Sequence, residues 1–154
     1  MLKTGSTVPD LALQTSDGRR LKLSDLRGEP VLLYFMRAAS CMMCNAHVKD
    51  LVARKREFDA RGVRVFIALP EDTEKAARWK AKRQVPFEVV TGRAGTPHEA
   101  VGLHAKMFGA MQQSGTVIVD AGGTVRHAHS ATVPNYDKQG IAETVGALAP
   151  ARGA

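Results

Sequence analysis

The sequence predicts an α/β fold, in which helices flank a mixed central sheet and an N-terminal hairpin extends it. Two observations carry this prediction. Apolar runs of strand length alternate along the chain with amphipathic segments of helix length, and a hairpin followed by a helix closes the pattern. The chain has 154 residues. Since domains most often contain about 100–150 residues, we expect residues 1–154 to form one domain.

The first third of the chain predicts a hairpin, one helical turn and a buried strand. Residues 8–15 alternate in polarity as a strand does, and Asp17-Gly18 supplies a turn before a second strand at residues 19–23. Residues 24–28 are typical of a single helical turn that ends at a glycine. Residues 31–36 are apolar at every position, so we expect a strand that is covered on both faces.

The middle of the chain predicts two helices that alternate with strands. A helix is expected over residues 41–61, because four apolar residues recur at helical spacing: Val48, Leu51, Val52 and Phe58. Residues 63–69 predict the next strand, residues 74–84 a second helix and residues 87–90 a further short strand.

The last third predicts a hairpin and a final helix. Residues 95–113 indicate an irregular or partly helical connection. Strands at residues 116–120 and 124–129 flank the turn Ala121-Gly122-Gly123, which is typical of a hairpin. The final helix is expected over residues 139–148, and the tail that follows it is expected to fray.

Composition excludes several classes of protein. Hydrophobic residues make up 44% of the chain and charged residues 24%, which is typical of a globular protein rather than a disordered or fibrous one. No apolar run approaches the ~20 residues that a membrane-spanning helix needs. The N-terminal residues contain no secretory apolar segment, so we expect a cytoplasmic protein that makes no contact with membranes.

The net charge is +7, from 22 Lys and Arg against 15 Asp and Glu. Such a balance favours acidic partners, but the basic residues are dispersed and aromatic residues are only 5% of the chain. The sequence therefore shows no cluster of aromatic residues on which the bases of a single-stranded nucleic acid could stack. We expect a solvated basic surface and no nucleic-acid partner.

The two cysteines lie three positions apart, as Cys41-Met42-Met43-Cys44, where a buried strand is followed by a helix. This spacing cannot connect distant parts of a fold, which leaves redox chemistry, metal binding or an inert pair. Backbone N–H groups and the helix dipole stabilise a thiolate in a first helical turn. Cys44 shares a stripe with Val48 and Leu51, so we expect Cys44 to be the more buried sulfur and Cys41 the more exposed one.

The motifs together resemble a known family. They are residues 9–13, Asp17-Gly18, residues 23–28, residues 31–35, Cys41–Cys44, and residues 116–120 with Gly123. This set, spread over residues 5–148, is similar to the alkyl hydroperoxide reductase/thiol-specific antioxidant (AhpC/TSA) branch of the thioredoxin-like superfamily. The resemblance implies a thioredoxin-like fold and an antioxidant oxidoreductase.

The candidate site departs from both kinds of protein in that branch, the peroxiredoxins and the thioredoxin-related thiol-disulfide reductases. In the peroxiredoxin register, Cys44 takes the peroxidatic position, Cys41 the threonine position and Arg37 the proline position. Ser114 stands where peroxiredoxins carry an arginine and where thioredoxins carry a cis-proline. Ser40 is the nearest hydroxyl-bearing residue, one position out of register.

Several neighbours have two interpretations each. Arg37 either stabilises a thiolate and orients a peroxide oxygen or is a solvated loop arginine. His47 either exchanges protons with a thiol or, as we favour, is a partly exposed helix histidine. Met42 and Met43 either help to bind Cu(I) or form apolar surface for a redox partner.

Three further residues receive the simpler interpretation. His127 and His129 are two apart on a strand, so they lie on the same side of it. They are half of a metal site or, as we favour, the polar face of an edge strand. Trp79 is expected to be a packing residue.

The working hypothesis is a cytoplasmic thiol-disulfide redox enzyme whose catalytic residues are Cys41, Cys44 and Arg37. One thiolate attacks a hydroperoxide or disulfide, the other cysteine closes the disulfide, and a thioredoxin-like or glutathione-like reductant reopens it. We favour Cys41 as the attacking sulfur in disulfide exchange, and leave the attacking sulfur open for peroxides. No cofactor and no metal is expected, and the resemblance implies a homodimer. The alternatives are a Cu(I)-binding or copper-delivery module and a redox-inactive scaffold that binds a partner.

Overall fold

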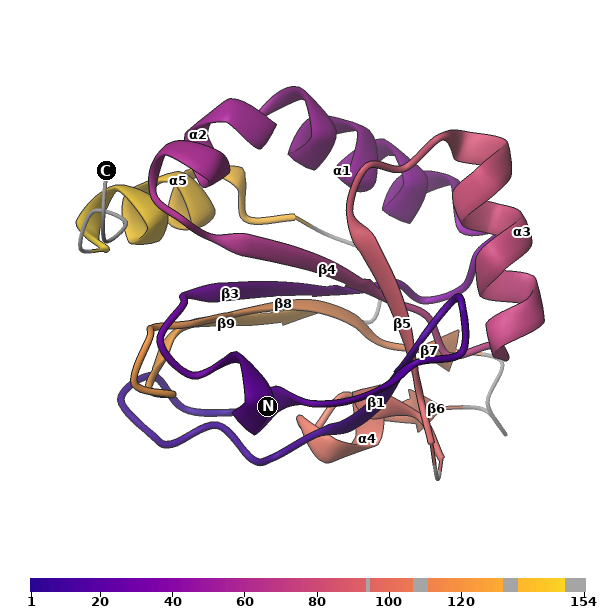
Figure 1. Ribbon diagram of the computed structural model, residues 1–154, viewed down its shortest axis with the longest axis horizontal. Helices are drawn as coiled ribbons and strands as arrows, with labels where there is room; N and C mark the ends of the chain where they lie inside the picture. The colour runs from indigo at the N-terminus through magenta and orange to yellow at the C-terminus, as the bar shows by residue number, and fades with distance from the viewer. Residues whose placement is uncertain (94, 107–110, 132–135, 149–154) are drawn as a thin grey trace.

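The computed structural model describes residues 1–93, 95–106, 111–131 and 136–148. Within these residues the main sheet has seven strands, in the spatial order β2-β1-β5-β4-β3-β8-β9 (Figure 1). The strands of this sheet are β1 (Ala12–Thr15), β2 (Arg20–Lys22), β3 (Val31–Phe35), β4 (Arg64–Ala68), β5 (Glu88–Gly92), β8 (Ser114–Val119) and β9 (Val125–Ala131). A separate small pair consists of β6 (Ala105–Lys106) and β7 (Met111–Gln112).

Six helices occur within the described residues. They are the 3₁₀-helix η1 (Leu23–Leu26) and the α-helices α1 (Met42–Ala53), α2 (Lys55–Ala60), α3 (Thr73–Arg83), α4 (Pro97–Ala100) and α5 (Lys138–Ala147). None of the described helices is long and apolar enough to cross a membrane.

The sheet is mixed, as predicted. Strand β3 pairs in parallel with β4, and β4 pairs in parallel with β5. Strand β8 runs antiparallel to β3 and β9 runs antiparallel to β8, while β1 and β2 extend the other edge as an antiparallel hairpin. Strand β3 is therefore an interior strand, and its carboxyl end lies between β4 and β8.

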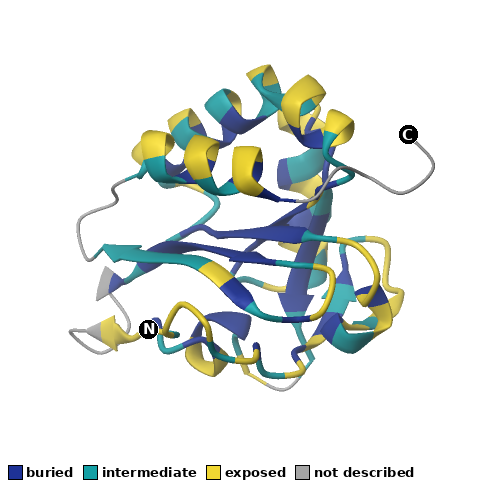
Figure 2. Ribbon diagram, turned by 90° about the vertical axis from the view of Figure 1, so that its left-hand side faces the viewer, coloured by how far each residue is buried: buried dark blue, intermediate teal, exposed yellow. Residues whose placement is uncertain are grey.

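The two faces of the sheet carry separate apolar cores. Leu32 and Tyr34 of β3 face one core, to which α1, α2, α3 and α5 contribute. Leu33 and Phe35 face the other core, which is covered by the N-terminal segment, η1 and the chain around α4. Figure 2 shows the strands buried beneath a layer of helices whose outer surfaces are exposed. All five residues of β3 are buried, which confirms the prediction of a strand covered on both faces.

The predicted helix over residues 41–61 is wrong in one respect, because it consists of two helices that meet at Arg54. Arg54 leaves the helical conformation at φ −101° and ψ 12°, and its guanidinium pairs with Asp50 of α1 and Glu57 of α2. Phe58 of α2 is buried with Leu51 of α1, so the apolar stripe continues across the break. No glycine or proline marks the break in the sequence.

Other boundaries also differ from the predictions. The first strand begins at Ala12 rather than at residue 8, since Pro9 has no N–H with which to pair, although Val8 and Leu11 are buried. The described part of residues 95–113 contains α4 and the short strands β6 and β7. The hairpin of residues 116–129 and the final helix are confirmed as β8, β9 and α5. The tail at residues 149–154, predicted to fray, lies outside the described residues.

Asn45 connects α1 to α3 and to the loop before α1. Its Nδ2 donates to the carbonyl oxygens of Ala39 (2.9 Å) and Cys41 (2.8 Å), and its Oδ1 accepts from the indole N–H of Trp79 (2.8 Å). Asn45 and Trp79 are both buried. Trp79 is thus the packing residue that was predicted, but its ring nitrogen also fixes the side chain that holds the cysteine loop.

His98 supports the carboxyl end of β3 from the opposite face. Its Nε2 lies 2.7 Å from the carbonyl oxygen of Met36, and its ring packs edge-on against Phe35. The side chain is fully buried, and burial lowers the pKa of His98 to about 4. The neutral imidazole therefore donates to Met36, immediately before the loop that leads to the cysteines.

We predict that Asn45→Ala lowers the free energy of unfolding by about 1–3 kcal/mol. The Trp79 N–H and the Ala39 carbonyl oxygen lose their Asn45 partner, and the Cys41 carbonyl oxygen keeps only the backbone N–H of residue 45. Urea unfolding at pH 7 measures the loss, with the exposed Gln139→Ala as the control that changes stability little. Unfolding of Asn45→Ala at the wild-type midpoint would show that the three hydrogen bonds contribute nothing.

We predict that the fold loses stability as the pH falls below 6.5. An unfolded histidine binds a proton near pH 6.5, whereas folded His98 resists protonation down to about pH 4, so His98 contributes its full stability above 6.5. Between pH 7 and pH 5 this one group costs about 2 kcal/mol. Urea unfolding at the two pH values measures it, and His98→Gln, which keeps a donor for Met36, should reduce the difference by that amount. An unchanged difference in His98→Gln contradicts the assignment.

Candidate active site

The loop between β3 and α1 presents the two cysteines, and the protein holds this loop through its backbone. The N–H of Met36 donates to the carbonyl oxygen of Ala68 on β4 (2.9 Å). The N–H of Ala39 donates to both carboxylate oxygens of Glu71 (3.0 and 3.1 Å), while Asn45 binds the carbonyl oxygens of Ala39 and Cys41. Backbone groups along the loop are thus bound from β4, from the segment before α3 and from α1.

Cys41 is the N-cap residue of α1. Its sulfur accepts a hydrogen bond from the backbone N–H of Cys44 at 3.2 Å, and the side chain is half-buried. A sulfur in this place meets the unpaired N–H groups and the positive end of the helix dipole, the arrangement that stabilises a thiolate. Cys41 is therefore both reachable from solvent and suited to negative charge.

Cys44 lies one turn into α1 and is fully buried. Burial, followed by the hydrogen bond with the Cys41 side chain, raises the pKa of the Cys44 thiol to about 12, although the N–H of Arg37 and the Tyr34 hydroxyl act in the opposite direction. The Arg37 N–H lies 3.5 Å from the Cys44 sulfur. Cys44 is consequently a neutral thiol at pH 7. It is also the more buried of the two cysteines, which confirms the sequence prediction.

Three aromatic rings gather on the inner side of α1. The Tyr34 hydroxyl lies 2.7 Å from Nδ1 of His47, and the His47 ring stacks on Tyr136 with 4.8 Å between centroids. Tyr136 also meets Tyr34 edge-on at 6.0 Å. His47 is indeed only partly exposed, as we favoured, but it is also fixed by Tyr34, a contact that the helix pattern did not predict.

The positions that distinguish the subclasses of the family also lie near the loop. Strand register pairs Phe35 with Gly115, so Ser114 lies beside the end of β3, where its side chain is fully buried. Arg37 is half-buried, and its backbone N–H contacts the Cys44 sulfur. A catalytic role for the Arg37 guanidinium stays a prediction.

Met42 and Met43 lie between the two cysteines in the sequence, and both side chains are exposed. Met42 is 85% exposed and Met43 is 49% exposed. His127 and His129 lie on β9, the edge strand of the sheet, which confirms their predicted place. Within the described residues, no three or more His, Cys, Asp and Glu side chains gather in a group able to hold a metal ion.

A basic groove runs beside the loop, and we call it the α3 groove. Its volume is about 400 Å³, and its lining residues are Ala39, Ser40, Glu71, Lys75, Arg78, Trp79, Lys82 and Arg83. Ala39 and Ser40 directly precede Cys41 in the chain, so the groove lies next to the cysteine loop, although neither cysteine lines it. Its four cations outnumber its one carboxylate, and that carboxylate is occupied by the N–H of Ala39.

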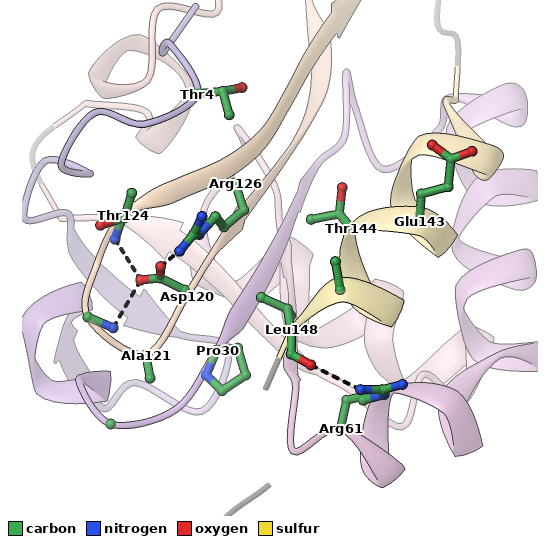
Figure 3. Close-up of a pocket in the computed structure, with 13 residues that line it drawn as sticks. Thr4, Pro30, Arg61, Asp120, Ala121, Thr124, Arg126, Glu143, Thr144 and Leu148 are labelled. Atoms are coloured by element: carbon green, nitrogen blue, oxygen red, sulfur yellow. Dashed lines mark hydrogen bonds and ion pairs between the residues drawn. The ribbon is translucent and has the colours of Figure 1, made fainter. Parts of the chain in front are cut away.

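A larger cavity of about 780 Å³ lies at the opposite end of β3, between Pro30 and the β8–β9 turn (Figure 3). Asp120 lines it, but its carboxylate accepts from the N–H groups of Gly122 and Thr124 and pairs with Arg126. Neither cysteine lines this cavity. We therefore place the candidate active site at the other end of the strand.

Sequence reasoning missed the residues that hold the site rather than those that react. Asn45 lies directly after the second cysteine, and a buried amide in the first turn of a helix has no periodic signal. Tyr34 was counted only as one apolar residue of a strand, since its hydroxyl contact depends on where α1 packs. Glu71 precedes the second predicted helix, and nothing in the sequence indicates that its carboxylate binds the Ala39 N–H.

Comparison with known proteins places this geometry in a family. Residues 4–128 match the model of the AhpC/TSA family. The chloroplastic peroxiredoxin Q of Oryza sativa subsp. japonica is 25% identical over 126 residues, which cover 82% of this chain and 58% of the relative. That of Suaeda salsa is 25% identical over 122 residues, which cover 79% and 57%. The chain thus spans somewhat more than half the length of these relatives.

Solved structures share the fold. Peroxidoxin BcpB from Mycobacterium tuberculosis aligns with a TM-score of 0.79 at 20% identity, over 95% of this chain and 96% of that one. Peroxiredoxin Q from Xanthomonas campestris aligns with a TM-score of 0.76 at 20% identity, over 93% and 96%. The fold is therefore the thioredoxin-like fold, as the sequence predicted. Since the family match covers residues 4–128, the chain belongs to the AhpC/TSA family.

Proposed function

We propose that this chain is a thiol-disulfide redox enzyme of the peroxiredoxin type, which reduces hydroperoxides or disulfides through Cys41 and Cys44. One observation carries the proposal: a half-exposed sulfur at the start of α1 lies beside a fully buried sulfur. Such a pair separates the two roles of a redox cycle, because one sulfur meets the substrate while the other is kept from it. Membership of the AhpC/TSA family supports this reading.

The proposed cycle begins with a hydroperoxide as substrate. The Cys41 thiolate attacks the terminal oxygen, the O–O bond breaks, and a proton completes the alcohol, which leaves Cys41 as a sulfenic acid. The Cys44 sulfur then attacks the Cys41 sulfur, and hydroxide leaves with a proton as water. The resulting Cys41–Cys44 disulfide is reduced to two thiols by an external dithiol, which is itself oxidised to a disulfide.

Cys41 is the proposed attacking sulfur, although the family register puts Cys44 in the peroxidatic position. The reason is access, since the fully buried Cys44 thiol offers no surface to a substrate and is protonated at pH 7. Arg37 is the third proposed catalytic residue. Its N–H contacts the Cys44 sulfur, and its guanidinium sits on the loop where a developing negative charge needs a cation.

Reduction of protein disulfides is the second candidate function, and the exposure of Met42 and Met43 favours it. A polypeptide substrate needs apolar surface beside the attacking sulfur, and these two residues provide it next to Cys41. With a disulfide R–S–S–R, Cys41 forms the mixed disulfide and releases one thiol. Cys44 then displaces the second thiol, so two electrons pass to the substrate.

The α3 groove is the proposed docking surface for the reductant. Its excess of cations beside Cys41 suits an acidic surface on a thioredoxin-like protein or the carboxylates of a glutathione-like thiol. Either reductant belongs to a reducing compartment, and the cytoplasm is our proposed location. Homodimerisation and the copper alternative stay predictions.

We predict that the wild type consumes a thiol reductant when hydrogen peroxide is added, and that Cys41→Ser abolishes this activity. Cys44→Ser should keep one rapid turnover, in which Cys41 is oxidised, and then stop, because no second sulfur can close the disulfide. Stopped-flow and steady-state assays with the same protein samples separate the two outcomes. Reduction of insulin disulfides by the wild type, assayed alongside, tests the second candidate.

Three results of the same assay would each contradict one part of the proposal. If Cys44→Ser loses the first turnover and Cys41→Ser keeps it, the assignment of the attacking sulfur is reversed. If the wild type reduces insulin but no peroxide, the peroxidase proposal fails and the disulfide reductase remains. Loss of both activities removes the enzymatic proposal.

We predict that charge reversal in the α3 groove slows the protein reductant selectively. Arg78→Glu combined with Lys82→Glu should lower the rate constant for reduction by a thioredoxin-like protein about tenfold at low salt, because association loses its electrostatic attraction. Reduction by the neutral dithiothreitol should not change. Arg20→Glu combined with Arg56→Glu alters the net charge equally at exposed sites outside the groove and is the matched control. Equal slowing by both pairs of substitutions would show that the net charge of the protein, and not the α3 groove, governs association with the reductant.

A further inference from the structure

A hydrogen-bonded path connects the buried sulfur to a partly exposed imidazole. The Tyr34 hydroxyl is within hydrogen-bonding reach of the Cys44 thiol, and it lies 2.7 Å from Nδ1 of His47. Tyr34 and Cys44 are both fully buried, whereas His47 is half-buried. The path therefore runs from the buried Cys44 thiol to the half-buried His47 ring, which exchanges protons with solvent.

The resolving step needs such a path. Cys44 attacks only as a thiolate, yet burial raises its pKa to about 12, so at pH 7 only about one molecule in 10⁵ carries the thiolate spontaneously. Solvent hydroxide has no access to a thiol with no exposed surface. The N–H of Arg37 supports negative charge on the Cys44 sulfur but cannot accept its proton.

His47 has the properties of the missing base. Burial lowers the pKa of His47, and the nearby Asp50 partly opposes this shift. Asp50 itself pairs with Arg54, which lies between α1 and α2, and with Lys138 of α5, so its charge is shared with two cations. The Tyr136 ring stacks on His47 and holds its plane. The imidazole is thus neutral at pH 7, and its Nδ1 accepts from the Tyr34 hydroxyl when Nε2 carries the hydrogen.

We propose that His47, acting through the Tyr34 hydroxyl, removes the proton of Cys44 while the Cys44 sulfur attacks oxidised Cys41. The Tyr34 proton moves to His47 Nδ1 as the thiol proton moves to the Tyr34 oxygen, so Tyr34 ends the step as it began. Burial raises the pKa of Tyr34, and therefore the two transfers occur together without a free tyrosinate. The new S–S bond forms, the Cys41–oxygen bond breaks, and the leaving hydroxide receives the proton that His47 gives up.

This inference rests on the proposed function, but its test does not require peroxidase activity. An aromatic disulfide whose thiolate is coloured reports both steps. Cys41 attacks it and releases the first thiolate, and Cys44 then displaces the second as the intramolecular disulfide closes. The first phase measures Cys41, and the second measures the deprotonation and attack of Cys44.

We expect His47→Gln and Tyr34→Phe each to slow the second phase about tenfold or more at pH 7 and to leave the first phase unchanged, because a general base contributes at least that much. In the wild type the rate of the second phase should level off above the pKa of His47. In both variants it should keep rising with pH towards the pKa of Cys44, as expected for a buried thiol that ionises without the imidazole. His104→Gln makes the same substitution at an exposed histidine outside this cluster and is the matched control.

The outcomes are distinct. A wild type that releases no second thiolate contradicts the proposed Cys41–Cys44 function itself. A wild type with two phases, and variants whose second phase keeps the wild-type rate and pH profile, would overturn the relay alone. His47→Gln retains an acceptor for Tyr34, so a variant with native thermal stability and a slow second phase separates proton transfer from packing.

Discussion

The chemistry of this protein depends on the hydrogen bond from the Cys44 N–H to the Cys41 sulfur in the first turn of α1. That bond fixes Cys41 at the N-cap, outside the helix, where an unpaired N–H group needs an acceptor. Helical geometry then carries Cys44 inward, onto the stripe of Val48 and Leu51. Within one helical turn, the backbone therefore places one cysteine thiol where it is partly exposed and the other where it is fully buried.

The rest of the fold holds that turn in place. Strand β3 is buried on both faces and ends at a carbonyl group that His98 binds from below the sheet. Above the sheet, Asn45 and Glu71 bind the backbone of the loop, and Trp79 fixes Asn45. These groups come from α1, α3, α4 and the segment before α3. A site held in this way loses little conformational entropy when it reacts, which is the physical basis of preorganisation.

Periodicity and turn residues were enough to predict the alternation of strands and helices, since β3 is apolar at each position and the β8–β9 turn contains two glycines. The relative burial of the cysteines followed from a four-residue spacing. The break at Arg54 could not be predicted in this way, because no proline or glycine marks it in the sequence. Nor could the pairing of Tyr34 with His47, which requires β3 and α1 to meet in space.

The central claim is that the two sulfurs differ in reactivity because they differ in burial. The rate at which each cysteine of the reduced protein is alkylated, followed by mass spectrometry across a pH series, tests this claim most directly. The account predicts that Cys41 is alkylated first at neutral pH and that Cys44 reacts only as the pH approaches the pKa of about 12. Modification of Cys44 at neutral pH at a rate equal to or above that of Cys41 would contradict it.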